Sequence, residues 1–230
     1  MGTIQAYDYD LPTLPEQALL IEQAVGVNGV AVRPLTARGF DLRPVPVGVM
    51  EWLTHRLAET WYNGRLYYEQ EWSTPGQWLA DGGILHESWV QPDGSLQVTP
   101  RVLSWVNAYD PAYRSLLEEM REIHEEWSGI PLEPSIAYGP RIYNAGAVLA
   151  RHVDKPATHV VGCSITIEAA TERPWPFVIE DHQSTAYAID IRPGEMLLFE
   201  SSRLPHCRPE PLRGSHYINF YLHYRPRQPG

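Results

Sequence analysis

Residues 143–168, YNAGAVLARHVDKPATHVVGCSITIE, contain the pattern that decides the fold. Two short runs rich in Val, Ile and Ala stand on either side of a polar segment, and each has the length of a β-strand. Asn144-Ala145-Gly146, just before the first run, has the chemistry of a turn. The stretch therefore predicts two β-strands joined by a polar loop.

The same pattern continues on both sides of this stretch. Prolines (21) and glycines (17) are scattered along the chain and aromatic residues reach 11%, as expected of short strands joined by turns. A mainly β fold, a sandwich or small barrel, is therefore predicted for residues 135–227. The strand-like runs are IAYGPRIY (136–143), AVLARHVD (147–154), VVGCSITIE (160–168), PFVIE (176–180), AYAIDI (186–191), EMLLFE (195–200) and HYINFYLHY (216–224).

Two helices are predicted before the strand-rich region. The stronger begins at Asp110, an N-cap candidate followed by Pro111, keeps apolar residues at helical spacing and ends at Gly129. The weaker covers about Val47 to Trp61. One face of the stronger helix should pack on a sheet, so we expect flanking helices on one sheet of a single domain (1–230), in which a helical and loop region (1–134) supports the β core.

The segment from Trp61 to Trp89, between these helices, is rich in aromatic residues. It has two interpretations: a substrate lid over a pocket, or the aromatic edge of a core.

Charge and composition exclude several classes of protein. With 18 basic and 28 acidic residues the net charge is −10, which disfavours a nucleic-acid partner. No apolar run approaches the roughly 18 residues of a membrane span, and the acidic N-terminus is unlike a signal peptide. Two cysteines do not make a disulfide framework. We therefore expect a cytoplasmic protein without a membrane anchor, and the sequence predicts no oligomeric state.

The chemistry centres on His152 and Asp154. One residue separates them, so in an extended strand both side chains leave the same face and can hold one ion. His206, which follows the EMLLFE strand, is the third candidate ligand. Two imidazoles and one carboxylate leave open positions on a metal, as in non-haem Fe(II) oxygenases. The alternative is a set of surface polar residues on an edge strand.

On these residues the chain resembles the prolyl 4-hydroxylase-like branch of the Fe(II)- and 2-oxoglutarate-dependent dioxygenases. The resemblance covers about residues 135–225 and rests on the order of RHVDKP (151–156), PGEMLLF (193–199), LPH (204–206) and HYINF (216–220). It implies a double-stranded β-helix, or jelly roll, with iron bound by His152, Asp154 and His206.

The resemblance also implies an activity. Fe(II), 2-oxoglutarate and O2, with ascorbate as an additional reductant, would oxidise an unactivated C–H bond and release succinate and CO2. We expect hydroxylation of a small molecule or amino-acid derivative. A peptidyl-prolyl hydroxylase, a non-catalytic cupin-like sensor and a jelly-roll enzyme that uses another metal remain alternatives.

The candidates for contacts with 2-oxoglutarate are Tyr143, His216, Arg213 and Arg208. Tyr143 stands where the family often has a tyrosine that contacts the cosubstrate, although a core tyrosine is an equal alternative. The family places Lys or Arg nine or ten residues after the distal histidine, whereas this chain has His216 there. If the face of His216, Ile218 and Phe220 lines the barrel, His216 points inward by parity. Arg213 is the second candidate and Arg208 a more remote one, and a core histidine without a ligand is the alternative for His216.

Other residues are given structural roles. His159 and His182 are predicted to be polar surface or loop residues, and His223 to face solvent or a helix. Arg151 lies on the opposite strand face from His152 and is predicted to form a salt bridge.

Overall fold

A computed structural model of the chain describes residues 1–8, 13, 18, 20–22, 24, 33–62, 67–68, 88–90, 96–98, 102–104 and 111–227. Almost all of the aromatic segment 61–89 lies outside these residues, so its two interpretations stay predictions.

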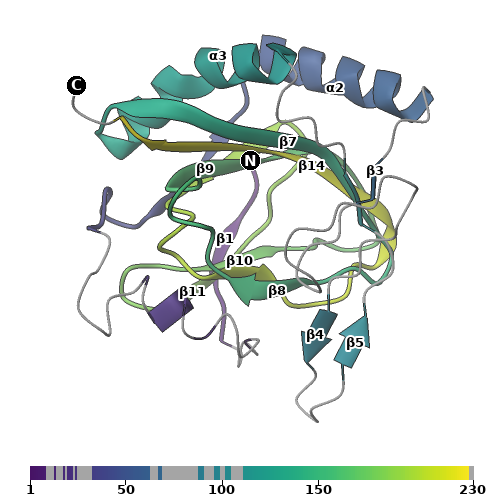
Figure 1. Cartoon of the computed structure of the whole chain (residues 1–230). Helices are drawn as coiled ribbons and strands as arrows, with labels where there is room; N and C mark the ends of the chain where they lie inside the picture. The colour runs from purple at the N-terminus through teal and green to yellow at the C-terminus, as the bar shows by residue number, and fades with distance from the viewer. Residues whose placement is uncertain are drawn as a thin grey trace.

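Two antiparallel sheets face each other (Figure 1). The minor sheet has the order β1-β11-β10-β13-β8, and the major sheet the order β2-β12-β9-β14-β7-β6-β3. The minor strands are β1 (Ile4–Ala6), β11 (Ala186–Ile189), β10 (Phe177–Glu180), β13 (His206–Arg208) and β8 (Leu149–His152). The major strands are β2 (Phe40–Pro44), β12 (Glu195–Phe199), β9 (Val161–Thr171), β14 (Gly214–Pro226), β7 (Leu132–Asn144), β6 (Val102–Ser104) and β3 (Tyr67–Tyr68). A separate hairpin pairs β4 (Ser88–Val90) with β5 (Leu96–Val98).

The predicted mainly β fold is confirmed, and each of the seven strand-like runs contains a strand. The structure adds strands that the sequence pattern does not mark. β13 is only three residues long, and β1 and β2 come from the region expected to contain helices and loops. β1 pairs with β11 and β2 pairs with β12, so the N-terminal region completes an edge of both sheets.

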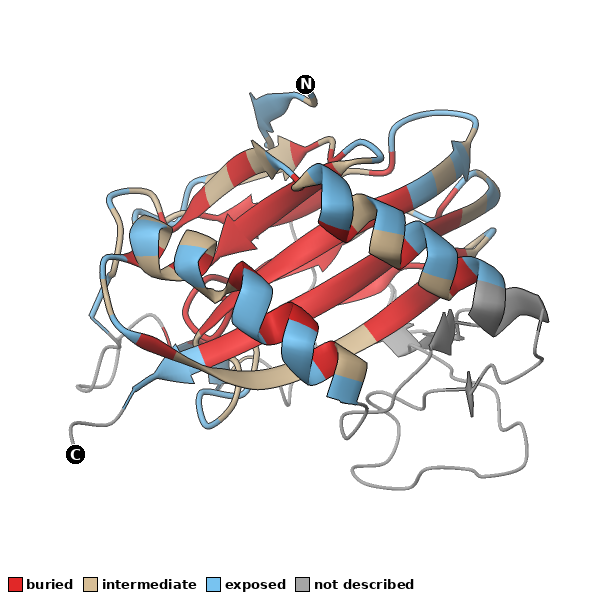
Figure 2. Cartoon of the chain, turned by 90° about the horizontal axis from the view of Figure 1, so that it is seen from above, coloured by how far each residue is buried: buried red, intermediate tan, exposed pale blue. Residues whose placement is uncertain are grey.

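The two predicted helices are confirmed as α2 (Val47–Tyr62) and α3 (Pro111–Ser128). Both lie over the outer face of the major sheet, and α3 runs across β7, β14 and β9 (Figures 1 and 2). Gly129 ends α3 in the left-handed region, φ 71°, and its N–H donates to the Glu125 carbonyl. This is the glycine C-cap that the sequence predicts. Within the described residues, no helix has both the length and the hydrophobicity of a membrane span.

The two faces of the major sheet differ in chemistry. The central strands beneath the two helices are largely buried (Figure 2). The helix-facing side is apolar and carries alternate residues of the central strands, which pack against α2 and α3. They include Cys163, Ile165 and Ile167 on β9, Ile218, Phe220 and Leu222 on β14, and Ile142 on β7. The other residues of the same strands face the minor sheet and are largely polar.

The space between the sheets is itself divided. Where β2 and β12 face β10 and β11, aliphatic and phenylalanine side chains fill it, among them Leu42, Leu197 and Ile179. Around β8, β13, β14 and β7 the buried side chains are polar, among them Arg141, His152 and Asn219. This polar half of the interior positions the candidate site.

Candidate metal centre

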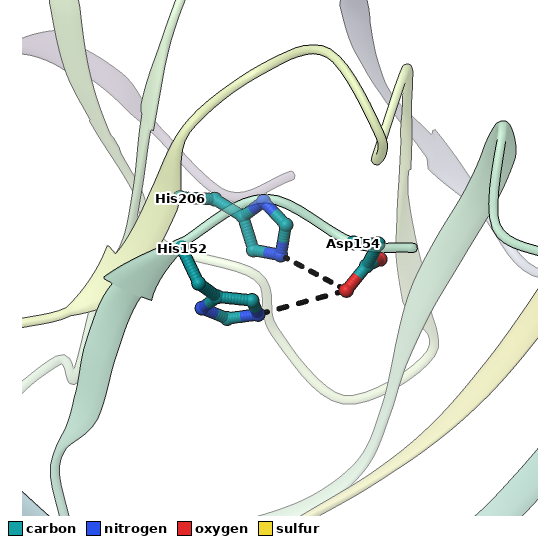
Figure 3. A group of neighbouring side chains, drawn as sticks. All are labelled: His152, Asp154 and His206. Carbon is teal, nitrogen blue, oxygen red and sulfur yellow. Dashed lines mark ion pairs between the residues drawn. The ribbon is translucent and has the colours of Figure 1, made fainter. Parts of the chain in front are cut away.

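The three predicted ligands come together at neighbouring ends of β8 and β13 (Figure 3). His152 is the last residue of β8 and lies directly opposite His206, the first residue of β13. Asp154 follows β8, and its backbone N–H donates to the Ser201 carbonyl in the loop that leads to His206. Strand pairing and this loop contact bring together residues that are 52 positions apart.

Both imidazoles are held in the orientation that a metal ligand needs. His152 Nδ1 lies 2.7 Å from the Ala150 carbonyl and His206 Nδ1 lies 2.9 Å from the Leu204 carbonyl. A carbonyl oxygen only accepts, so each Nδ1 carries the hydrogen and Nε2 is the nitrogen that can ligate a metal. Phe177 stacks on the His206 ring, with centroids 5.3 Å apart, and helps to fix its plane.

The ligand atoms of the three side chains all lie within 4.8 Å of one another. Asp154 Oδ1 is 3.6 Å from His152 Nε2 and 3.9 Å from His206 Nε2, so one carboxylate oxygen faces both imidazoles (Figure 3). The side chains are 8%, 14% and 4% exposed in the order His152, Asp154, His206. The described residues contain no other such group of histidine, cysteine or carboxylate ligands.

The site favours the protonation states that bind a metal. Burial raises the pKa of Asp154, but the contact with His152 and the interactions with His206, His223 and His159 outweigh it, so the pKa lies far below its usual range. Burial, followed by the charge of His152, lowers the pKa of His206 to about 3. At neutral pH the carboxylate is ionised and the His206 imidazole is neutral.

Arg208, two residues after His206 on β13, is 0% exposed. Its guanidinium carbon lies 4.3 Å from the ring centre of Tyr217 and 4.5 Å from that of Trp175. Nη1 donates to the Trp175 carbonyl, while Nε and Nη2 have no hydrogen-bond partner among the described residues. A buried cation with two unused donors is costly unless an anion completes it. Arg208 thus places two unused donors in the same polar interior as the triad.

Tyr143 also lies inside, as its candidate role requires. It is completely buried on β7, and its hydroxyl is 3.0 Å from that of Tyr221 on β14. Asn219 Nδ2 donates to the Tyr221 hydroxyl at 2.7 Å. Burial raises the pKa of Tyr221, and the charges of Arg141 and Arg208 act in the opposite direction. Whether Tyr143 contacts a cosubstrate stays a prediction.

The structure does not bring His216 or Arg213 to the triad. His216 Nε2 lies 2.8 Å from Glu168 Oε1 in a partly exposed pair, and Arg213 is exposed. His216 was expected to point into the barrel on the same face of the strand as Ile218 and Phe220. That expectation is wrong, because this face packs against the helices. The inner face of β14 instead carries Tyr217, Asn219, Tyr221 and His223.

One histidine assignment needs correction. His223 is 1% exposed and faces the triad rather than solvent or a helix, with Nδ1 3.9 Å from Asp154 Oδ2. His159 and His182 lie in loops, as predicted. His159 is half-buried, with its ring centre 4.0 Å from that of His223. The side chain of His182 is 6% exposed and lies 3.3 Å from the Glu200 carboxylate.

Burial, followed by the charge of His159, lowers the pKa of His223 well below its usual value. The alternation Tyr-Ile-Asn-Phe-Tyr-Leu-His in 217–223 contains the signal that places this residue inside. Once the alternate apolar residues of β14 are assigned to the helix side, this alternation predicts that His223 points between the sheets.

The prediction for Arg151 is confirmed. Its Nε and Nη2 bind the two carboxylate oxygens of Glu180 on β10, at 2.5 and 2.8 Å. This bidentate pair lies on the face of β8 opposite His152 and links β8 to β10 across β13 within the minor sheet.

No protein-family model matches this sequence, and no curated protein matches it. Solved structures are similar at low sequence identity. A prolyl-4-hydroxylase from Pseudomonas putida has a TM-score of 0.57 and 13% identity, covering 90% of this chain and 100% of its own. HygX from Streptomyces hygroscopicus, solved with nickel and 2-oxoglutarate bound, has a TM-score of 0.54 and 16% identity, covering 94% and 88%.

A third similar structure is the α-ketoglutarate-dependent non-haem epimerase SnoN from nogalamycin biosynthesis. It has a TM-score of 0.56 and 12% identity and covers 91% of this chain and 84% of its own. These neighbours include prolyl hydroxylases and other 2-oxoglutarate-dependent enzymes. The chain therefore has the jelly-roll fold that these oxygenases share, which confirms the fold expected from the resemblance.

Proposed function

We propose that this protein is an Fe(II)- and 2-oxoglutarate-dependent oxygenase that hydroxylates, or otherwise oxidises, an unactivated C–H bond. The observation that carries the proposal is the convergence of His152, Asp154 and His206 within 4.8 Å in a buried, polar interior. Two imidazoles and a carboxylate are the donor set that suits Fe(II) and leaves positions open for other ligands. When bound, Fe(II) with the keto acid and O2 would supply the oxidising chemistry.

The surroundings of the triad fit such a metal. The Ala150 and Leu204 carbonyls fix the tautomers of His152 and His206, so Nε2 is the ligating nitrogen of both imidazoles. Phe177 and Phe199 pack around the His206 ring and keep water from that side. The protein thus holds the ligands in place and restricts access to them.

Arg208 is our proposed anchor for the distal carboxylate of 2-oxoglutarate. A guanidinium binds a carboxylate through parallel N–H donors, and Arg208 offers Nε and Nη2, which have no partner among the described residues. The rings of Tyr217 and Trp175 shield it from water, which strengthens such a pair. His216 and Arg213 lack this combination of burial and free donors.

For the substrate we propose a small molecule or amino-acid derivative. HygX has been solved with hygromycin B bound, and SnoN comes from nogalamycin biosynthesis, so the fold serves small-molecule chemistry in those two proteins. Prolyl hydroxylases have the same fold, one of them in complex with a peptide fragment of hypoxia-inducible factor. A peptidyl proline is therefore the competing substrate.

The test is succinate formation. Purified protein is incubated with Fe(II), ascorbate, O2 and 2-oxoglutarate, first alone and then with a pool of metabolites and with proline-containing peptides. We expect slow succinate release alone and faster release with a metabolite fraction. Faster release with peptides only would correct the substrate class. No succinate under any condition, together with no binding of 2-oxoglutarate, would refute the oxygenase.

A further inference from the structure

His223 is a buried imidazole that the proposed iron and 2-oxoglutarate contacts do not use. It lies on the inner face of β14, and neither ring nitrogen has a hydrogen-bond partner among the described residues. Tyr138 stacks on its ring, with centroids 5.5 Å apart and planes 17° apart, and the His159 ring lies 4.0 Å away. Burying an imidazole without partners is unfavourable, so a role for its nitrogens is expected.

Gly162 makes room for this ring. The two residues are directly opposite on β9 and β14, and a Cβ at position 162 would stand 2.6 Å from His223 Nδ1 and 3.0 Å from its Cε1. The φ of Gly162 is not in the left-handed region, so its backbone conformation is open to any residue. The glycine therefore provides space for the His223 ring.

The two oxygens of Asp154 face different partners. Oδ1 faces His152 and His206, at 3.6 and 3.9 Å, and is the oxygen that a shared metal ion would use. Oδ2 is the oxygen 3.9 Å from His223 Nδ1. A carboxylate that ligates through one oxygen keeps its orientation best when a donor holds the other.

We propose that His223 is a positioning residue for the iron ligand Asp154. The 3.9 Å between Nδ1 and Oδ2 is too long for a hydrogen bond in the metal-free chain. When a metal ion draws Asp154 into its ligand position, the gap would close and Nδ1–H would donate to Oδ2, which leaves Oδ1 as the single ligand oxygen and keeps the remaining metal positions open. Gly162 is part of the same arrangement, because its missing side chain leaves the space that the His223 ring occupies beside Asp154. The inference rests on the proposed metal site and adds residues from the opposite sheet to it.

Metal affinity, measured without turnover, tests the proposal. We would titrate the metal-free protein with Co(II), an air-stable substitute for Fe(II), by calorimetry and by its visible absorption. His223→Ala should weaken Co(II) binding by about tenfold to 100-fold, the usual loss when a partner of a metal ligand is removed. His223→Asn, whose amide nitrogen can stand close to the position of Nδ1, should recover most of the affinity, whereas His223→Gln should not.

A double-mutant cycle with Gly162 separates positioning from packing. Gly162→Ala alone should displace the ring and weaken Co(II) binding in the same direction. In the His223→Ala background the same glycine change should have no further effect on affinity, because there is no ring to displace.

His124→Phe is the matched control. His124 is equally buried and its ring lies 4.3 Å from that of Tyr224, the next residue of β14, but on the helix side of the sheet. Its replacement should leave Co(II) affinity unchanged even if the melting temperature falls.

Three results would overturn the inference. The first is an unchanged Co(II) affinity in His223→Ala. The second is an equal loss of affinity in the Asn, Gln and Ala variants, which would mean that His223 acts through packing alone. A loss in His124→Phe as large as that in His223→Ala is the third. Absence of Co(II) and Fe(II) binding by the wild-type chain would refute the proposed function as well, so the two failures are distinguishable.

Discussion

The two faces of β14 show how one strand can serve two purposes. Toward the helices it presents Ile218, Phe220, Leu222 and Tyr224, which are all 2% exposed or less. Toward the minor sheet it presents Tyr217, Asn219, Tyr221 and His223, which are as deeply buried and carry polar groups. Apolar burial stabilises the fold, whereas polar burial is costly and is retained where a ligand uses it. We therefore expect changes on the outer face to reduce stability and changes around the inner face to reduce ligand binding.

The largest effect on the inner side should come from Asp154→Ala. Without the carboxylate, only two imidazoles remain, and we expect complete loss of Fe(II) binding and of succinate formation. Metal analysis after dialysis and the succinate assay measure these losses. Asp190→Ala, which removes a surface carboxylate paired with Arg192, is the control and should behave as wild type. An Asp154→Ala variant that still holds one Fe(II) per chain would refute the assigned ligands.

Arg208→Met should give the next largest effect. Loss of a buried, charge-assisted carboxylate contact costs about 2–5 kcal/mol, so 2-oxoglutarate affinity should fall by a factor of about 30 or more. Stability without ligand should be unchanged or higher, because an apolar chain replaces an uncompensated charge. Calorimetry with 2-oxoglutarate and a metal-loaded protein, and a thermal melt, measure the two quantities.

His216→Ala and Arg213→Ala compare the other candidate anchors with Arg208. We expect both to bind 2-oxoglutarate as the wild type does. A larger loss of 2-oxoglutarate affinity in either variant than in Arg208→Met would mean that Arg208 on β13 is not the anchor.

Leu222→Ala tests the outer face. Leu222 is completely buried against the helix layer, and its truncation should lower the free energy of unfolding by about 2–5 kcal/mol. Metal and 2-oxoglutarate affinities should stay within twofold, because Leu222 points away from the triad. Chemical denaturation and calorimetry give both numbers. A large loss of affinity in a still folded variant would break the division between the two faces.

His124 lies on α3 and packs against the helix side of the major sheet. It should have a smaller effect, on the pH dependence of the free energy of unfolding. Burial lowers its pKa to about 4 from 6.5, so the folded chain holds it neutral while the unfolded chain protonates below pH 6.5. Its contribution is therefore fully present above pH 6.5 and is lost as pH falls toward 4, by about 3 kcal/mol. Unfolding measured from pH 7 to 4 should show a shallower loss for His124→Phe than for wild type. Parallel profiles would contradict the assignment.

Most of the β core and α3 could be predicted because their signals are local. α3 has an apolar stripe and a terminal glycine, and each predicted strand is an apolar run bounded by turn residues. β13 is too short and polar to give such a signal, although it carries His206 and Arg208. The edge strands β1 and β2 depend on pairing with distant strands, which a local pattern does not contain.

The site shows the same limit. His152, Asp154 and His206 could be named from spacing and order, and the structure places them together. The parity of β14 could not be decided, because both of its faces are buried and the choice depends on which face the helices cover. That choice removes His216 from the interior and brings in His223. Arg208 becomes the preferred anchor only through burial and unused donors, which are properties of the folded chain.

The central claim is that His152, Asp154 and His206 hold one Fe(II) with positions left open for a keto acid. Anaerobic addition of 2-oxoglutarate to the Fe(II)-loaded protein tests it directly, through the visible charge-transfer absorption of a keto acid chelated to Fe(II). We predict a band that saturates at one Fe(II) and one 2-oxoglutarate per chain, is absent in Asp154→Ala and needs more 2-oxoglutarate in Arg208→Met. Bound Fe(II) and bound 2-oxoglutarate without such a band, or a full band in Asp154→Ala, would contradict the account.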